Sequence, residues 1–452
     1  MKRLAEFCLR EWKNDQNRKS LLLRGARQVG KTFTVREFGR TFANTVEINF
    51  ESKPDLARIF DHDLNPLRIA QDLALACNQP IKPGQTLLFL DEIQQAPKAL
   101  TALRYFTEEL PALHVVAAGS LLDFALDEAG IPVGRVSSLW MRPMSFVEFI
   151  AAKNKQQAIL ALADHDPDRP FPEAVHRDLI RDVGEYLAVG GMPEAVREWL
   201  SERDLLRCSR VHVRIADAYR QDFAKYSRKH QIKYVELLFE EIPRFLGRRF
   251  VFSHLKGAWR RRDLQPALDL LTKAGVAHAV CQTAATGLPL GAEQDPERFK
   301  TLFLDVGLAE ALLGFDGKPW ILEPDAAFAN AGQLAEAFVG QELLAYSQTD
   351  RAASLHYWHR EERASVAEVD YVVAGSNHVI PVEVKSGTTG QLKSLRLFLD
   401  ARKTVAPYGV RFSLHNFSRQ PDLHSYPLYA VIAFAAAHNP SLREAVRMLG
   451  NG

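Results

Sequence analysis

One short segment near the N-terminus limits the fold more than any other part of the sequence. Residues 25–32 read GARQVGKT and match the pattern G-x-x-x-x-G-K-[ST]. The segment follows the apolar stretch SLLLRG and precedes a helical pattern, as a loop between a strand and a helix requires. Backbone N–H groups at such a helix N-terminus can hold phosphate oxygens. We therefore predict a nucleotide-binding loop rather than a chance glycine-rich turn.

Four residues of this loop are expected to hold ATP: Gly25, Gly30, Lys31 and Thr32. The glycines let the backbone wrap around the phosphates. Lys31 would neutralise charge on the β- and γ-phosphates, and Thr32 would be a ligand of Mg²⁺.

A second element lies further along the chain, where the apolar stretch TLLFLDE ends in Asp91 and Glu92. We expect Asp91 to hold the Mg²⁺ through a water molecule and Glu92 to orient and activate the attacking water. An acidic pair at the end of a strand could also be a surface turn, but the loop upstream favours the catalytic interpretation.

Ser120 and Arg135 are further catalytic candidates. Ser120 ends the strand-like stretch VVAAGS, where it could contact the γ-phosphate or serve as a helix N-cap. Arg135 comes just before the stretch RVSSLWM, and in ring-forming ATPases an arginine there reaches the γ-phosphate of the neighbouring subunit. A solvated or ion-paired arginine is the alternative.

The chain as a whole is predicted to be an α/β protein with several domains. In residues 1–150, five strand-like stretches are separated mostly by helical patterns, which predicts a parallel sheet. Residues 176–246 have a helical period and are assigned to a helical lid. Residues 247–315 follow the helix–helix–strand–strand order of a winged helix, and residues 325–440 form a last α/β domain.

Composition narrows the function classes. The chain has 452 residues, with 57 Lys plus Arg against 55 Asp plus Glu, so a nucleic-acid footprint must be local. The four cysteines lie far apart without a C-x-x-C pair, which favours a reducing compartment over a disulfide framework or zinc site. The longest apolar run, YPLYAVIAFAAA, is too short to span a bilayer, and the first residues lack a signal-peptide core. We therefore expect a soluble, cytoplasmic protein without a membrane partner.

The segment VDYVVAGSNHVIPVEVKSG carries a second candidate site. A two-residue turn at Ser376 and Asn377 would set Asp370 directly opposite Glu383 on one face of a hairpin, with Lys385 on the same face. Two carboxylates can hold Mg²⁺, or Mn²⁺, while a lysine orients water or stabilises developing charge.

This D…E-x-K arrangement resembles that of restriction-endonuclease-like nucleases, and the spacing is similar to that of archaeal Holliday-junction resolvases. Such folds usually add an acid from an earlier helix, for which Glu336 in QLAEAFVGQEL is the candidate. An exposed cross-strand charge pair is the plain alternative for Glu383 and Lys385. Apolar neighbours argue against it, because a buried acid needs a metal or a partner.

A basic cluster in the winged-helix region is the candidate DNA contact, although a solvated face would look the same. Trp259 is interleaved among its members: Arg248, Arg249, Lys256, Arg260, Arg261 and Arg262.

Taken in order, the motifs resemble those of the AAA+ superfamily, and more narrowly of its bacterial and archaeal ATPases with an uncharacterised C-terminal domain. The motifs that carry the resemblance span nearly the whole chain: GARQVGKT, FLDEIQ, GSLL, GRV, RPMSFVEF, YLAVGGMPEAV, YRQDFAKY, ALDLLTKAGV, FLDVGL and VDY…VEVKSG. The resemblance implies an ATPase that forms an oligomer, such as a hexameric ring.

Two functions follow as hypotheses. The first is an ATP-driven DNA translocase or branch-migrating motor fused to a Mg²⁺-dependent endonuclease that selects branched DNA. The second is a regulatory NTPase switch whose C-terminal domain binds DNA or another partner without cutting.

Overall fold

The computed structural model of the chain describes residues 1–120, 122, 134–165, 168–226, 231–257, 259–350, 353–362, 365–387 and 392–451. The chain divides into two compact units, which we describe separately. The N-terminal unit comprises residues 1–142, 273–275 and 348–352. The C-terminal unit comprises residues 143–272, 276–347 and 353–452.

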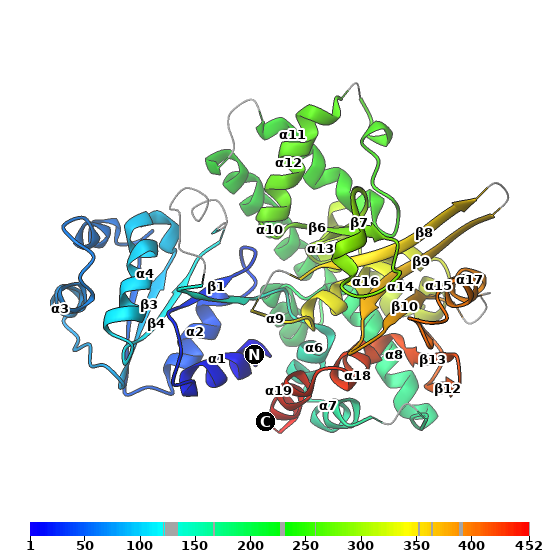
Figure 1. Cartoon of the computed structure of the whole chain (residues 1–452), viewed down its shortest axis with the longest axis horizontal. Helices are drawn as coiled ribbons and strands as arrows, with labels where there is room; N and C mark the ends of the chain where they lie inside the picture. Colours follow the sequence, from blue (N-terminus) through cyan, green and yellow to red (C-terminus); the bar gives the residue numbers. More distant parts are fainter. Residues whose placement is uncertain are drawn as a thin grey trace. The chain divides into compact units, whose positions relative to one another are not determined.

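The N-terminal unit is built on a parallel five-stranded sheet (Figure 1), which confirms the predicted α/β core. The strand order is β2-β3-β4-β1-β5. Every residue of β3 and β4 is buried, as expected for central strands of a parallel sheet. The bounds are β1 (Leu21–Arg24), β2 (Asn44–Asn49), β3 (Thr86–Asp91), β4 (His114–Ala118) and β5 (Ser137–Trp140).

Helices connect these strands, and two of them share a core with the sheet. Leu88 and Leu90 of β3 belong to the same buried cluster as Ile69 of α3 and Phe106 of α4. Asn65 caps α3 by accepting N–H bonds from the first turn, which fixes where that helix begins. The bounds are α1 (Ala5–Asn14), α2 (Lys31–Gly39), α3 (Pro66–Cys77) and α4 (Pro97–Glu109), with short 3₁₀ turns η1 (Pro54–Phe60) and η2 (Ile93–Gln95).

The C-terminal unit combines a helical part with a mixed eight-stranded sheet in the order β12-β13-β11-β10-β9-β8-β6-β7. Its strands are β6 (Ala277–Thr283), β7 (Gln294–Phe303), β8 (Leu355–Glu362), β9 (Ser365–Ala374), β10 (Val379–Val384), β11 (Gly409–Ser413), β12 (Ser418–Gln420) and β13 (Leu423–Pro427).

The helices of this unit precede, interrupt and follow the sheet (Figure 1). They are α6 (Phe146–Ala152), α7 (Gln156–Ala163), α8 (Glu173–Val189), α9 (Pro193–Glu202), α10 (Leu205–Tyr226), α11 (Ile232–Glu241), α12 (Arg261–Lys273), α13 (Val306–Leu312), α14 (Lys318–Leu322), α15 (Pro324–Ala329), α16 (Gly332–Ala345), α17 (Lys393–Ala401), α18 (Val431–Ala437) and α19 (Pro440–Gly450). Short 3₁₀ turns are η3 (Ile242–Phe245), η4 (Phe252–His254), η5 (Leu290–Glu293) and η6 (Leu428–Ala430).

The two strands expected to form a wing have a different role. β6 and β7 do pair antiparallel, but β6 also pairs in parallel with β8, so the hairpin is the edge of the large C-terminal sheet. The predicted boundary between residues 315 and 325 therefore falls inside one sheet. A helix–helix–hairpin pattern looks the same in sequence whether its hairpin ends in solvent or joins further strands.

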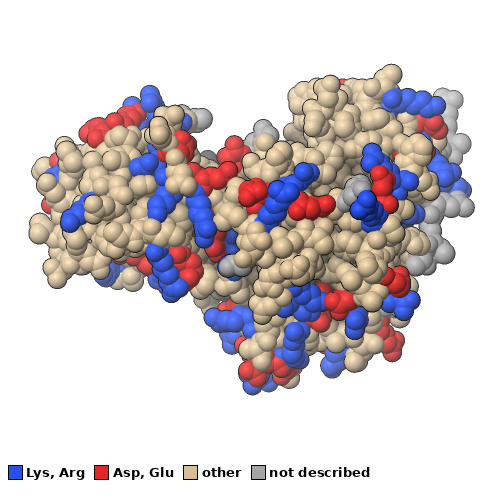
Figure 2. All heavy atoms as spheres, turned by 90° about the horizontal axis from the view of Figure 1, so that it is seen from below, with Lys and Arg blue, Asp and Glu red and all other residues tan. Residues whose placement is uncertain are grey.

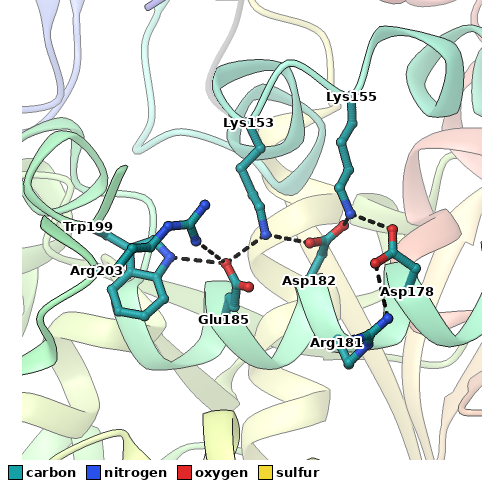
Figure 3. Close-up of polar contacts among 8 residues, drawn as sticks. All are labelled: Lys153, Lys155, Asp178, Arg181, Asp182, Glu185, Trp199 and Arg203. Atoms are coloured by element: carbon teal, nitrogen blue, oxygen red, sulfur yellow. Dashed lines mark hydrogen bonds and ion pairs between the residues drawn. The ribbon is translucent and has the colours of Figure 1, made fainter. Parts of the chain in front are cut away.

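Buried ion pairs tie α8 to the start of α7 and the end of α9. Asp178, Asp182 and Glu185 lie on one face of α8, and two lysines from the turn before α7 bind them (Figure 3). Lys153 Nζ lies 2.5 Å from Asp182 Oδ1 and 2.6 Å from Glu185 Oε2. Lys155 Nζ lies 2.5 Å from Asp182 Oδ2 and 2.6 Å from Asp178 Oδ2. We call these five residues the α8 network.

Three further side chains complete the partners of the α8 network (Figure 3). Trp199 Nε1 and Arg203 Nη1 both donate to Glu185 Oε2, at 3.0 and 2.9 Å. Arg181 Nη2 donates to Asp178 Oδ1 at 3.3 Å.

Surface charges of both signs are interspersed on the face drawn in Figure 2, as expected for a net charge of +2. None of the helices in the described part of the chain has the length and apolar character needed to cross a membrane.

Candidate functional site

The predicted phosphate loop connects β1 to α2. Gly25 has φ +137°, and a Cβ there would lie 2.1 Å from the Met141 carbonyl oxygen, so only glycine fits. Gly30 has φ +97° and precedes the first residue of α2, Lys31. The loop thus ends at a helix N-terminus, where free N–H groups and the helix dipole favour phosphate.

Lys31 lies within the loop rather than in solvent. Its Nζ donates to the carbonyl oxygens of Gly25, at 2.9 Å, and Ala26, at 2.8 Å. Burial lowers the pKa of Lys31 to about 8, although Glu92 and Asp91 oppose the shift. A phosphate group would supply the negative charge that keeps this ammonium protonated.

The two predicted acids lie at the end of β3 and have separate partners. The Thr32 hydroxyl donates to Asp91, 3.1 Å from Oδ2, and Asn49 Nδ2 donates to the same oxygen at 3.1 Å. Glu92 follows in the left-handed region, with φ +51°, and its Oε2 accepts from Gln94 Nε2 at 2.5 Å. The strand end therefore directs Asp91 toward Thr32, while Gln94 holds Glu92.

Burial raises the pKa of Asp91, although hydrogen bonds from Thr32 and Asn49 oppose this, and it raises the pKa of Glu92 as well. A raised pKa makes Glu92 a better proton acceptor for water. The neighbouring Thr32 hydroxyl and Asp91 carboxylate are hard oxygen donors that fit Mg²⁺. When bound, this ion would offset negative charge on the phosphates.

The second candidate site begins with the β9–β10 hairpin, whose predicted register is confirmed. Tyr371 lies opposite Val382, so one step further along the strands sets Asp370 opposite Glu383. The Val384 N–H donates to Asp370 Oδ2 at 2.7 Å. Both acids are thus held by the pairing of these two strands.

A lysine outside the hairpin enters this group of acids. Lys300 extends from β7 past the ring of Tyr357, whose centroid is 5.2 Å from Nζ. Its Nζ lies 2.8 Å from Glu336 Oε1, 2.6 Å from Glu368 Oε1 and 4.0 Å from Asp370 Oδ1. Only 2% of the Lys300 side chain is exposed.

Lys385 binds the remaining acid, since its Nζ lies 2.6 Å from Glu383 Oε1. The other oxygen, Oε2, is buried and has no hydrogen-bond partner among the described residues. We call this group the Lys300 cluster; its members are Lys300, Glu336, Glu368, Asp370, Glu383 and Lys385.

Burial governs the pKa values of these acids. It raises the pKa of Glu336 to about 8 and that of Glu383 to about 7, and repulsion from Asp370 adds to both shifts. Burial also raises the pKa of Asp370. It lowers the pKa of Lys300, but the carboxylates of Glu336, Asp370 and Glu368 outweigh burial, so the net shift is upward.

The arrangement does not fit the divalent ion predicted for it. No three His, Cys, Asp or Glu side chains in the described part of the chain are grouped so that they could hold a metal. The ammonium of Lys300 lies among Glu336, Glu368 and Asp370 instead. The assignment of Asp370 and Glu383 as ligands of Mg²⁺ or Mn²⁺ stays a prediction.

Comparison with known proteins assigns the first site to a family. A family model described as an AAA domain matches residues 17–150, which contain the loop, Asp91 and Glu92. Residues 17–150 are an AAA domain. Two further models, each described only as a domain of unknown function, match residues 180–319 and 331–431. No curated protein matches the chain at a significant level.

Several solved structures are similar to the chain, all at low identity. A Walker-type ATPase of Pyrococcus abyssi has 16% identity and a TM-score of 0.43, over 69% of this chain and 94% of that chain. The ORC2 protein of Aeropyrum pernix has 15% identity and a TM-score of 0.32, over 72% and 93%. DnaA from Aquifex aeolicus, with bound AMPPCP, has 12% identity and a TM-score of 0.27, over 59% and 75%. These scores are too low to add detail to the AAA assignment.

Two further residues of the AAA domain lie near strand ends. Ser120 is buried and follows β4 by two residues. Arg135 precedes β5 by two residues, and its Nη1 lies 3.3 Å from Glu108 Oε1. More than half of the Arg135 side chain is exposed, so it can leave this weak surface pair. The predicted roles of both residues stay predictions.

The predicted DNA contacts lie before and within the start of α12. All are exposed except Arg249, which is half-buried and whose backbone forms a bridge to Lys300. Arg261 pairs with Glu297 at 2.7 Å. Trp259 is anchored rather than free, because its Nε1 donates to the Lys256 carbonyl at 2.7 Å.

Sequence reasoning missed Asn49, Gln94 and Lys300, which contact predicted residues. It also missed Glu368, which contacts Lys300. Lys300 was detectable in part, because it is a single charge inside the apolar stretch FKTLFL. Glu368 lies two residues before Asp370 and therefore on the same strand face. Asn49 ends β2, beside the end of β3.

Proposed function

We propose that the AAA domain hydrolyses ATP with Mg²⁺, and that hydrolysis changes how the protein acts on DNA. One observation supports hydrolysis above all others. Thr32 contacts Asp91, next to a glutamate that Gln94 orients, within one loop-and-strand-end arrangement. This is the set of groups needed to hold a metal–nucleotide and to activate water.

Measurement of ATP turnover tests the first part. Lys31→Ala should abolish turnover, because its ammonium offsets phosphate charge. Glu92→Gln should keep nucleotide affinity and block hydrolysis, because an amide cannot accept the proton. Lys82→Ala is the matched control, since Lys82 is an exposed lysine at the opposite end of β3. Unchanged turnover in Lys31→Ala contradicts the assignment.

Exposed basic side chains around the start of α12 support DNA as the partner. Phosphate contacts by such residues make affinity fall with salt, with a slope of about −0.9 per phosphate on duplex DNA. Joint replacement of Lys256, Arg260 and Arg262 by alanine should therefore weaken binding and flatten this slope. Arg177→Ala, which removes an exposed arginine paired with Glu173, is the control. An unchanged slope in the triple variant excludes this surface.

The rate of ATP hydrolysis in the presence of DNA distinguishes a motor from a regulatory switch. A motor or translocase should hydrolyse ATP faster when linear, forked or four-way DNA is added, and branched forms should stimulate most if they are its substrate. A regulatory NTPase should hydrolyse slowly and with equal rate on all of them. In the second case the C-terminal unit would bind DNA or another partner.

If Arg135 completes the ATP site of a neighbouring subunit, the active protein must be an oligomer, such as a ring. Arg135→Ala should keep ATP affinity and lower turnover by a factor of about 10³ or more. Mixing it with Lys31→Ala protein should restore part of the activity at shared interfaces. If mixed oligomers form but activity is not restored, Arg135 has a structural role in its ion pair with Glu108 and does not act on a neighbouring subunit.

Metal-dependent, structure-selective DNA cleavage by the C-terminal unit is a second candidate function. The hairpin register favours it, since Asp370 and Glu383 are opposite and Lys385 contacts Glu383. Wild-type protein with Mg²⁺ or Mn²⁺ should then cut one of the three DNA forms, and Asp370→Asn should not. Lack of cleavage by the wild type removes this candidate and leaves ATP hydrolysis unaffected.

A further inference from the structure

The Lys300 cluster contains a buried positive charge beside Asp370, one of the two acids predicted to hold a divalent ion. Glu336 from α16, Glu368 and Asp370 from β9 are brought together, although they are distant or alternate in sequence. Such convergence of acids normally requires a cation, because isolated buried carboxylates are costly. The cation present among them is the ammonium of Lys300.

The Lys300 ammonium is placed so that it can neutralise these carboxylates. A lysine has three N–H donors and one positive charge. Two donors have carboxylate acceptors at hydrogen-bond distance, Glu336 and Glu368, and Asp370 lies within ion-pair range. The β7 strand and the Tyr357 ring hold the side chain, which is almost fully buried, so it cannot swing into solvent without disrupting the sheet edge.

We propose that Lys300 is a built-in replacement for the metal ion, so that the C-terminal unit works without a divalent cation. A Mg²⁺ or Mn²⁺ ion among these acids would lie within a few ångströms of the ammonium, where two positive charges repel in a poorly solvated site. The carboxylate oxygens that such an ion would prefer as ligands already accept hydrogen bonds from Lys300 and Lys385. As placed, no three acids of the described residues form a metal site. Removal of Lys300 should let Glu336, Glu368 and Asp370 close around a divalent ion.

This inference opposes the second candidate function, because Lys300 in place of a metal ion would leave the C-terminal unit without metal-dependent cleavage. It is independent of ATP hydrolysis. It is tested by metal binding rather than by cleavage, in full-length protein without nucleotide. The Asp91→Asn background removes the charged one of the two expected Mg²⁺ ligands of the AAA domain, Thr32 and Asp91. Mn²⁺ binding is then measured by electron paramagnetic resonance, and the melting temperature is measured with and without Mn²⁺ or Ca²⁺.

In this background, the protein with Lys300 intact should bind no Mn²⁺ at micromolar concentrations and show no shift in melting temperature. Lys300→Met keeps the length of the side chain and removes its charge. It should bind about one Mn²⁺, and its melting temperature should rise by about 5 °C or more at 100 times the Kd. Lys300→Arg keeps the charge and should remain metal-free.

Lys153→Met is the matched control, because Lys153 is a buried lysine with two carboxylate partners in the same unit. Its removal leaves Lys155 on Asp182 and Arg203 on Glu185, so no cation site opens. The melting temperature of Lys153→Met should fall, and divalent ions should not restore it.

If protein with Lys300 intact binds Mn²⁺ as tightly as Lys300→Met, or if Lys300→Met folds and binds none, the proposal is wrong. Should Lys300→Met fail to fold, the measurement on protein with Lys300 intact still decides.

Discussion

The α8 network and the Lys300 cluster are two groups of lysines and carboxylates in one unit, each with a buried centre, and they balance charge differently. In the α8 network, three carboxylates face two lysines, and Arg181 and Arg203 add further positive charge. In the Lys300 cluster, four carboxylates face two lysines, and one buried oxygen has no partner in the described part of the chain.

The pKa shifts follow this difference. Burial raises the pKa values of Asp178 and Glu185, but their bonds to Lys155 and Lys153 outweigh it, so both end below their usual values. In the Lys300 cluster burial prevails for Glu336 and Glu383, whose pKa values end well above the usual range. A fully paired network serves stability, whereas an incompletely paired one costs stability and marks a site with another use.

The largest expected effect comes from breaking the α8 network. Asp182→Asn removes the carboxylate shared by Lys153 and Lys155, of which only 3% is exposed. The loss should be about 3 kcal/mol in the free energy of unfolding, because the buried ammonium of Lys153 and the partly buried one of Lys155 each lose a partner. Urea unfolding followed by near-ultraviolet circular dichroism measures it.

Arg181→Ala is the control for this variant. Arg181 is an exposed partner of Asp178, so its removal should change stability by no more than about 0.5 kcal/mol. Equal losses in both variants would mean that the burial of Asp182 contributes nothing.

A smaller effect of opposite sign is expected in the Lys300 cluster. Glu383→Gln removes a buried charge whose Oε2 has no partner among the described residues, while Lys385 remains partly exposed to water. At pH 8 the variant should be as stable as the wild type or more stable by up to about 1 kcal/mol. A loss like that of Asp182→Asn would show that the cluster is as well paired as the α8 network.

The contrast between the two groups also explains what the sequence could reveal. The hairpin register was predictable because it depends on a two-residue turn at Ser376 and Asn377, next to the strands that it joins. The phosphate loop was predictable because its residues are contiguous. The entry of Lys300 into the cluster depends on the pairing of β6 with β8, which are more than 70 residues apart, and no local pattern reports that pairing.

The α8 network is an intermediate case. Asp178, Asp182 and Glu185 are spaced along one helix face, which is readable from sequence, but exposed acids have the same spacing. Their pairing with Lys153 and Lys155 depends on how the turn before α7 packs against α8, which the sequence pattern leaves open.

The smallest expected effect is a difference in pH dependence. Since the pKa values of Glu336 and Glu383 are raised on folding, the folded state holds protons that the unfolded chain releases near its usual value of 4.5. The contribution of these groups is therefore fully present at lower pH, and it is lost as pH rises toward about 7 and 8.

Asp178 and Glu185 of the α8 network have the opposite pH dependence. Their pKa values are lowered on folding, so the stability that they contribute is lost only when the pH falls through those lowered pKa values. Glu383→Gln should flatten the decline between pH 5 and 8 by no more than about 0.3 kcal/mol per pH unit, because the total gain at pH 8 is at most about 1 kcal/mol. Asp182→Asn does not touch Glu336 or Glu383 and should leave that decline unchanged. Urea midpoints measured every half unit from pH 4 to 9 test this, and a Glu383→Gln profile parallel to that of the wild type would mean that Glu383 is already ionised in the fold.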